Sequence, residues 1–131
     1  MYVQGDIMDE EFFEKSRHIT VLGFDKYHGS KPFTINGIIK LVKEPENKYD
    51  TEAIAAHMRY FGKIGYVANS TRSVITGTMS SGRLYDKIDD EYYAKIKFIT
   101  SSRAVCEILS SEEYTEELKN PESDIHFIST N

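Results

Sequence analysis

Residues 43–54, with the sequence KEPENKYDTEAI, hold the side chains best suited to binding chemistry in this 131-residue chain. Tyr49 and Asp50 stand next to each other there, between two apolar runs. An aromatic ring can stack on a flat ligand, and a carboxylate accepts hydrogen bonds from hydroxyl or amino groups. Pro45 and Asn47 predict a loop, and loops on a rigid scaffold are where binding residues concentrate. The pattern favours a ligand-binding loop at the rim of a sheet.

Both side chains also have structural interpretations. Tyr49 can plug the end of a barrel, and Asp50 can cap its turn by accepting a hydrogen bond from the backbone N–H of Glu52. Residue chemistry alone leaves these alternatives open. A catalytic pair of Asp50 and Glu52 is disfavoured, because we expect their side chains to point to opposite faces of the chain.

Other chemistry-bearing residues predict no catalytic, metal or cofactor site. Two glycines precede Lys31, but their spacing and the following Pro32 do not fit a phosphate-binding loop. The four histidines lack metal-ligand spacing, and the single cysteine, Cys106, builds neither a zinc site nor an internal disulfide. The acidic run 89–91 is typical of a solvated turn. We therefore expect a protein that is not an enzyme and needs no cofactor.

Charge divides the chain into three segments. Residues 17–109 carry 14 Lys and Arg against 10 Asp and Glu, a net +4, whereas residues 1–16 carry −4 and residues 110–131 carry −5. A mildly basic domain can bind phosphate groups. Its acidic ends are either solvated or shield the basic face of the domain. No run approaches the ~20 apolar residues that cross a bilayer, and residues 1–16 lack a targeting pattern. We expect a cytoplasmic protein.

Alternating apolar residues and turn signals predict a mainly β fold. The expected strands cover residues 18–24, 33–42, 53–59, 63–67, 92–100 and 104–109. Asn36-Gly37 marks a turn or bulge, and 61–62 closes a hairpin. In the fifth strand, one face is expected to carry Tyr92, Ala94, Ile96 and Phe98.

Helices are expected to be few. Asn69 or Ser70 can cap a helix that runs to about residue 78, with Gly82 as its stop. Ser111 and the following acidic residues predict a short terminal helix, and we expect the chain to be loose from Pro121 onward. Six short antiparallel strands with one or two short helices predict a small OB- or SH3-like β-barrel.

The loop also belongs to a larger pattern. Leu22-Gly23 and Tyr27-His28-Gly29 precede it, and GKIGYV follows at 62–67. In this order and spacing, residues 17–109 resemble the HIRAN domain family. The resemblance implies an OB- or SH3-like barrel with helical insertions, here flanked by an acidic N-terminal segment (1–16) and an acidic C-terminal helix or tail (110–131). It is the pattern of a stand-alone, bacterial-type member.

The resemblance also implies a function. In family members joined to DNA-remodelling motors, this loop holds the 3′-terminal nucleotide of single-stranded DNA, with the tyrosine stacked on a base and the aspartate accepting the 3′-hydroxyl. It implies a non-catalytic module that recognises 3′ ends or single-stranded DNA during DNA repair or processing. The implied partner is a helicase or nuclease acting in trans, and no association with a membrane is expected. The implied binding residues are Asn47, Tyr49, Asp50, Lys26, Tyr27, His28, Tyr66 and Asn69.

Departures from the family pattern weaken this expectation. Those members carry an arginine and an aromatic residue where this chain has Asp25 and Lys26. They carry a histidine where it has Tyr66, and a lysine where it has Asn69. Loss of one stacking ring costs ~1–3 kcal/mol per base, so weak binding is expected. The alternative is a protein-interaction or regulatory barrel that has lost DNA binding. The feature that separates the two is whether the basic residues share a concave surface with Tyr49, Asp50 and Tyr66.

Overall fold

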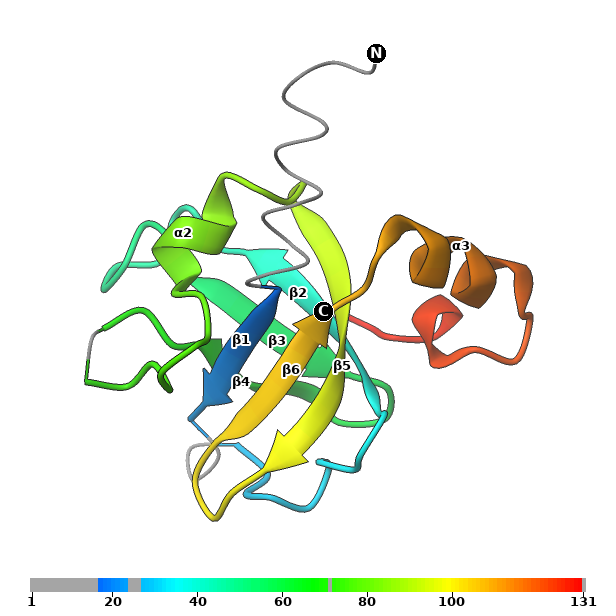
Figure 1. Ribbon diagram of the computed structural model, residues 1–131, viewed down its shortest axis with the longest axis horizontal. Coiled ribbons are helices and arrows are strands. Elements are labelled where there is room, and N and C mark those ends of the chain that lie inside the picture. Colours follow the sequence, from blue (N-terminus) through cyan, green and yellow to red (C-terminus); the bar gives the residue numbers. More distant parts are fainter. Residues whose placement is uncertain (1–16, 24–26, 71, 131) are drawn as a thin grey trace.

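A closed antiparallel barrel forms the centre of the computed structural model, which describes residues 17–23, 27–70 and 72–130 (Figure 1). Its strands follow the order β1-β4-β3-β2-β5-β6 around the barrel. They are β1 (His18–Leu22), β2 (Ile38–Lys43), β3 (Ile54–Met58), β4 (Gly62–Val67), β5 (Glu91–Ile99) and β6 (Ala104–Ile108). Two short helices accompany them, α2 (Ser81–Tyr85) and α3 (Ser111–Lys119). The predicted mainly β barrel with short helices is confirmed.

The barrel interior is filled by the inward side chains of all six strands. Aliphatic residues dominate it, including Ile19, Val21, Ile39, Leu41, Ile54, Ile64 and Ile96, each fully buried. Burial of one such side chain stabilises the fold by about 1.5–3 kcal/mol. Cys106 belongs to the same core, and burial raises the pKa of its thiol well above the ordinary value. It packs as a small apolar residue.

Gly65 allows β1 and β4 to approach each other closely. A Cβ atom at this position would overlap the carbonyl oxygen of Leu22. The neighbouring residue of β4, Tyr66, is paired with Leu22 in the same ladder. The glycine of the sequence pattern therefore serves strand packing, and it fixes the position of the tyrosine that follows it.

The helix predicted after residue 69 is wrong. Turns occupy this region, and Gly77 has a φ of +93°. The Ser70 and Ser73 side chains bond to each other and to nearby backbone, which competes with helix formation. The helix begins later, at α2, with Ser80 as its N-cap. Gly82 lies inside α2 and does not stop a helix.

Two predicted strands also need correction. The second strand begins only at Ile38, because Thr34 to Gly37 form a hydrogen-bonded turn with Asn36 at a φ of +68°. In β5, a register shift between Ile96 and Phe98 ends the expected alternation. Phe98 is 60% exposed, so it does not share the buried face of Ile96.

The C-terminal segment packs against the barrel, contrary to the expected loose end. A capping box formed by Ser110 and Glu113 starts α3, and Tyr114 stacks on Tyr93 with ring centroids 5.7 Å apart. After α3, the 3-10 helix η2 (Asp124–His126) contacts β2, and both Ile125 and Ile128 are buried.

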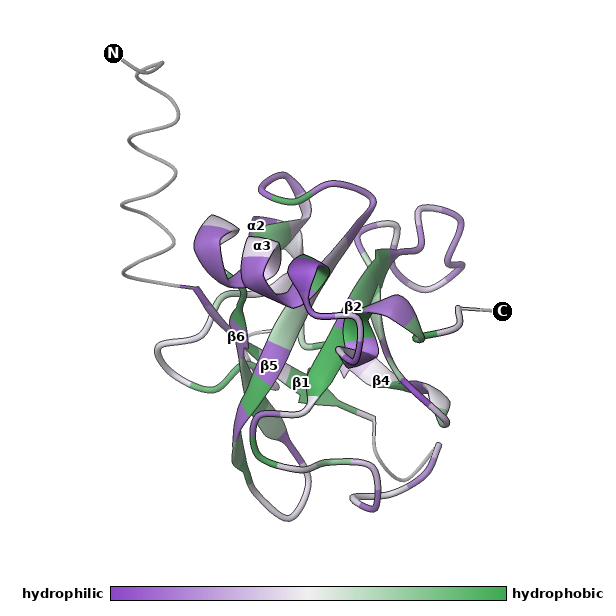
Figure 2. Cartoon of the chain, turned by 90° about the vertical axis from the view of Figure 1, so that its right-hand side faces the viewer, coloured by the Kyte–Doolittle hydropathy of each residue, from purple (hydrophilic) through white to green (hydrophobic). Residues whose placement is uncertain are grey.

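The two helices lie on different sides of the barrel, with α2 near the loop of residues 44–53 and α3 away from it (Figure 1). The side of α3 turned toward the viewer in Figure 2 is largely hydrophilic. None of the helices in the described part of the chain is both long and apolar enough to cross a membrane.

Candidate functional site

Asn47 organises the loop between β2 and β3. Its side-chain oxygen accepts hydrogen bonds from the backbone N–H groups of Tyr49 at 2.9 Å and Asp50 at 3.1 Å. Its amide nitrogen donates to Glu44 Oε1 at 3.0 Å. At the base of the loop, the N–H of Glu44 donates to the carbonyl of Ala53 at 2.8 Å. Asn47 therefore holds the backbone in the shape that presents the next residues.

Tyr49 presents its ring to solvent. The residue is 90% exposed, which excludes the alternative that it plugs the end of the barrel. Large aromatic side chains are usually at least partly covered in folded proteins. Its backbone is fixed by Asn47, so the ring is free for stacking on a ligand while its attachment point is held.

Asp50 is held from two directions. Its Oδ1 accepts a hydrogen bond from the N–H of Glu52 at 2.8 Å, so the predicted Asx turn is present. Its Oδ2 accepts one from the side-chain amide of Asn69 at 2.8 Å. Asn69 is anchored in turn, because its oxygen accepts from the N–H of Gly82 in α2 at 2.7 Å. An ionised carboxylate offers about four acceptor positions, so Asp50 retains capacity for a ligand hydroxyl.

Tyr66 belongs to a charged network on the barrel surface. Its hydroxyl donates to Glu44 Oε1 at 2.8 Å and accepts from Lys63 Nζ at 2.8 Å, and Lys63 also contacts Glu44 Oε2 at 2.7 Å. Burial alone would raise the pKa of Glu44, but the hydrogen bond from Lys63 and two weaker ones hold it below its ordinary value. Burial alone would lower the pKa of Lys63, but its interactions with Glu44 and Tyr66 together outweigh this effect and the pKa is raised above its ordinary value. The network is a tight ion pair around the phenol.

The rings upstream of the loop divide between two places. Tyr27 lies beside Tyr66, with ring centroids 6.4 Å apart at a tilt of 53°. His28 instead contacts the end of the β3–β4 hairpin, where its Nε2 lies 2.8 Å from the carbonyl oxygen of Phe61. Lys26 lies outside the described residues.

Hydrogen bonds and ring contacts connect most of the predicted residues into one site. They link Tyr27, Tyr66, Asn47, Tyr49, Asp50 and Asn69, through Glu44. His28 lies at the hairpin end instead. Sequence reasoning missed Glu44, whose role as the junction between loop and strand depends on a contact with Tyr66, 22 residues away. The loop pattern includes Glu44, but nothing in the sequence indicates this contact.

Two of the lysines near the loop site are engaged within the protein. Lys43 donates to the carbonyl of Ile88 at 2.7 Å and lies 4.6 Å from the centroid of the Tyr85 ring. Lys63 is paired with Glu44. Lys48, next to Tyr49, is exposed. The cationic part of the site is therefore small.

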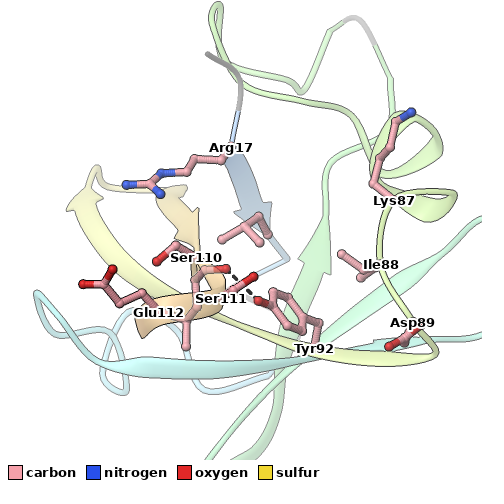
Figure 3. Close-up of a pocket in the computed structure, with 10 residues that line it drawn as sticks. Arg17, Lys87, Ile88, Asp89, Tyr92, Ser110, Ser111 and Glu112 are labelled. Carbon is pink, nitrogen blue, oxygen red and sulfur yellow. Dashed lines mark hydrogen bonds between the residues drawn. The ribbon is translucent and has the colours of Figure 1, made fainter. Parts of the chain in front are cut away.

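A groove of about 660 Å³ lies elsewhere, between the start of β5 and the start of α3 (Figure 3). Tyr92, Arg17 and Glu112 are among its lining residues, and none of the predicted site residues that the structure describes lines it. Within the same described part, no group of three His, Cys, Asp or Glu is placed to hold a metal ion. The groove is separate from the loop site.

Comparison with known protein families places most of the chain in one family. The family model described as the HIRAN domain matches residues 16–107, and the chain belongs to this family. HIRAN domains are DNA-binding modules and are not themselves catalytic. No curated protein and no solved structure gives a significant match. Nucleic-acid binding is therefore the general function that family membership supports.

Proposed function

We propose that this protein is a non-catalytic module that binds the 3′-terminal nucleotide of single-stranded DNA at Tyr49 and Asp50. The observation that carries the proposal is the pairing of a 90% exposed ring with a carboxylate held by Glu52 and Asn69. The terminal base stacks on Tyr49, and Asp50 accepts a hydrogen bond from the 3′-hydroxyl. The biological context is DNA repair or processing, with a helicase or nuclease acting in trans.

Asp50 gives the site its preference for an end. An internal nucleotide has no free 3′-hydroxyl, and its 3′-phosphate would be repelled by the carboxylate. A hydrogen bond to a charged acceptor contributes about 1.5–3 kcal/mol. The fixed position of Asp50 supports this role, because the acceptor needs little rearrangement when the nucleotide arrives.

Binding is expected to be weak. Lys63 is already neutralised by Glu44 and Lys43 is directed to Ile88, so few lysines remain to contact phosphate. Stacking on Tyr49 contributes ~1–3 kcal/mol per base. Ring contact and the hydroxyl acceptor therefore supply most of the proposed affinity.

The test compares short single strands that differ only at their ends. Fluorescence anisotropy would measure binding of one sequence with a free 3′-hydroxyl, with a 3′-phosphate and with a 3′-deoxy end, alongside a 5′-phosphorylated control. We expect the free hydroxyl to bind about tenfold to a hundredfold more tightly than either blocked 3′ end. Equal affinities would refute end recognition. Absence of binding to every strand would instead support a protein-interaction barrel.

A further inference from the structure

The outer face of the β3–β4 hairpin extends away from the loop site. Alternate residues of β3 point into the core, namely Ile54, Ala56 and Met58. Ala55 and His57 lie on the other face of β3, where both are buried, and their cross-strand partners across a register shift are Tyr66 and Lys63. The β4 residues Tyr66 and Lys63 thus lead along the hairpin from the loop site toward the closing turn.

An exposed aromatic residue occupies that closing turn. Tyr60 is 86% exposed and has a φ of +76°, a left-handed conformation that is costly for a residue with a large side chain. The guanidinium carbon of Arg59 lies 4.7 Å from the centroid of its ring and 4.1 Å from that of Phe127. Arg59 is fixed by an ion pair with Asp124 at 3.1 Å. One side of Tyr60 is therefore supported while most of the residue is open to solvent.

We propose that Tyr60, supported by Arg59, is a second stacking platform that holds an upstream base of the same single strand. This inference rests on the proposed function, which places the 3′ end at Tyr49. Because the guanidinium of Arg59 lies over one face of the Tyr60 ring, the opposite face is left to stack on an unpaired nucleobase.

The charges around the β3–β4 hairpin favour base stacking over phosphate contact. Each of its three cations is paired with a carboxylate: Lys63 with Glu44, Lys40 with Glu91, and Arg59 with Asp124. Neutralised cations attract phosphate weakly, whereas the π-face of Tyr60 is unaffected by these pairs. The occupant that fits is therefore a base of a single strand that continues from the loop site.

The β3–β4 ladder sets a lower limit on the spacing of the two platforms. Tyr66 is four residues from Gly62, where β4 begins beside the turn, which is roughly 13 Å at ~3.3 Å per residue. Tyr49 precedes β3 and Tyr60 follows it, so both rings lie beyond the ends of this ladder and are separated by at least about four nucleotides at the stacked rise of ~3.4 Å. A footprint of this size agrees with the ~4–16 nucleotides bound by single OB folds.

The experiment is an abasic scan with the full chain. Eight-nucleotide strands with a free 3′-hydroxyl would each lack one base, and anisotropy would give the affinity of each. Wild-type protein should lose affinity at the terminal base and again at one position at least about four nucleotides upstream, each loss being about fivefold to a hundredfold. Tyr60→Asn should remove only the upstream loss, and Tyr60→Phe should restore it. Asn tolerates a left-handed φ, so this variant is expected to keep its fold.

Phe98→Ser is the matched control, because it removes an exposed ring on β5 and should leave the abasic profile unchanged. An upstream profile that is flat in wild type, or unaltered by Tyr60→Asn, would overturn the second platform while the 3′-end preference remained. Loss of end preference in wild type itself would refute the proposed function, and the platform with it.

Discussion

Asp50 combines two tasks that a substitution can separate. Asn at this position retains an oxygen for the N–H of Glu52 and so keeps the Asx turn, but it loses the negative charge and the acceptor for the side-chain amide of Asn69. Asp50→Asn should reduce the preference for a free 3′-hydroxyl over a 3′-phosphate by about tenfold, because a neutral acceptor bonds more weakly and no longer repels phosphate. Titration of both strands by anisotropy would measure the ratio.

Glu52→Gln provides the control, because it removes the same charge two residues away. An equal loss of preference in both variants would reduce the role of Asp50 to general electrostatics. Asp50→Ala should show the same loss together with a stability cost of about 0.5–2 kcal/mol, by analogy with the loss of a side-chain cap.

His57 makes folding sensitive to pH. It is 6% exposed, its Nδ1 has no hydrogen-bond partner among the described residues, and it lies between Lys40 and Lys63. Burial lowers the pKa of His57 below 6.5, and Lys63 lowers it further, while Glu44 and Glu91 act in the opposite direction. The unfolded chain therefore binds the proton more readily, and stability should fall as the pH drops below about 6.5, by at most ~1.4 kcal/mol per pH unit.

Urea unfolding at pH 7.5, 6.5 and 5.5 would measure this effect. His57→Gln removes the titrating group, and its stability should change less across the same range. Parallel curves for the two proteins would assign the pH dependence to other groups.

Among the secondary-structure elements, the C-terminal segment offers a clear test of packing. Ile125 is buried in η2, so Ile125→Ala should lower the free energy of unfolding by about 2–5 kcal/mol. Ile35 is 56% exposed, and Ile35→Ala should change it by less than ~0.5 kcal/mol. Urea denaturation would compare the two. Equal, small effects would mean that residues beyond α3 contribute little to the fold.

Sequence patterns predicted the strands well because their signals are local. Runs of β-branched residues and the loop at residue 47 indicated the barrel, and the Ser-Glu pattern after residue 109 indicated α3. The packing of Ile125 was missed because it depends on β2, more than 80 residues earlier in the chain. Phe98 was misplaced because a one-residue register shift leaves no mark in the alternation. For the site, the sequence indicated which residues could bind a ligand. The ion pair around Tyr66 could be identified only from the folded structure.

For the molecule as a whole, paired charges predict a weak response to salt. Arg17 and Lys95 are also paired, with Glu107 and Glu117. If about three phosphates or fewer are contacted, the logarithm of affinity should fall with the logarithm of salt concentration with a slope of ~2 or less in magnitude. Anisotropy titrations between low and moderate salt would measure it, and a slope above ~4 would mean that more than about five phosphates are contacted.

The barrel closes by pairing its first strand with its last, which has a mechanical consequence. β1 and β6 are antiparallel, with His18 opposite Glu107, so residues 17 and 108 emerge at the same end of this seam. Tension applied through both ends of the domain would separate the ladder one pair at a time instead of shearing all pairs together. The next contacts of β1 are with β4, where Leu22 pairs with Tyr66. A pull on a tethered domain would thus open the seam first and then reach the tyrosine beside the loop.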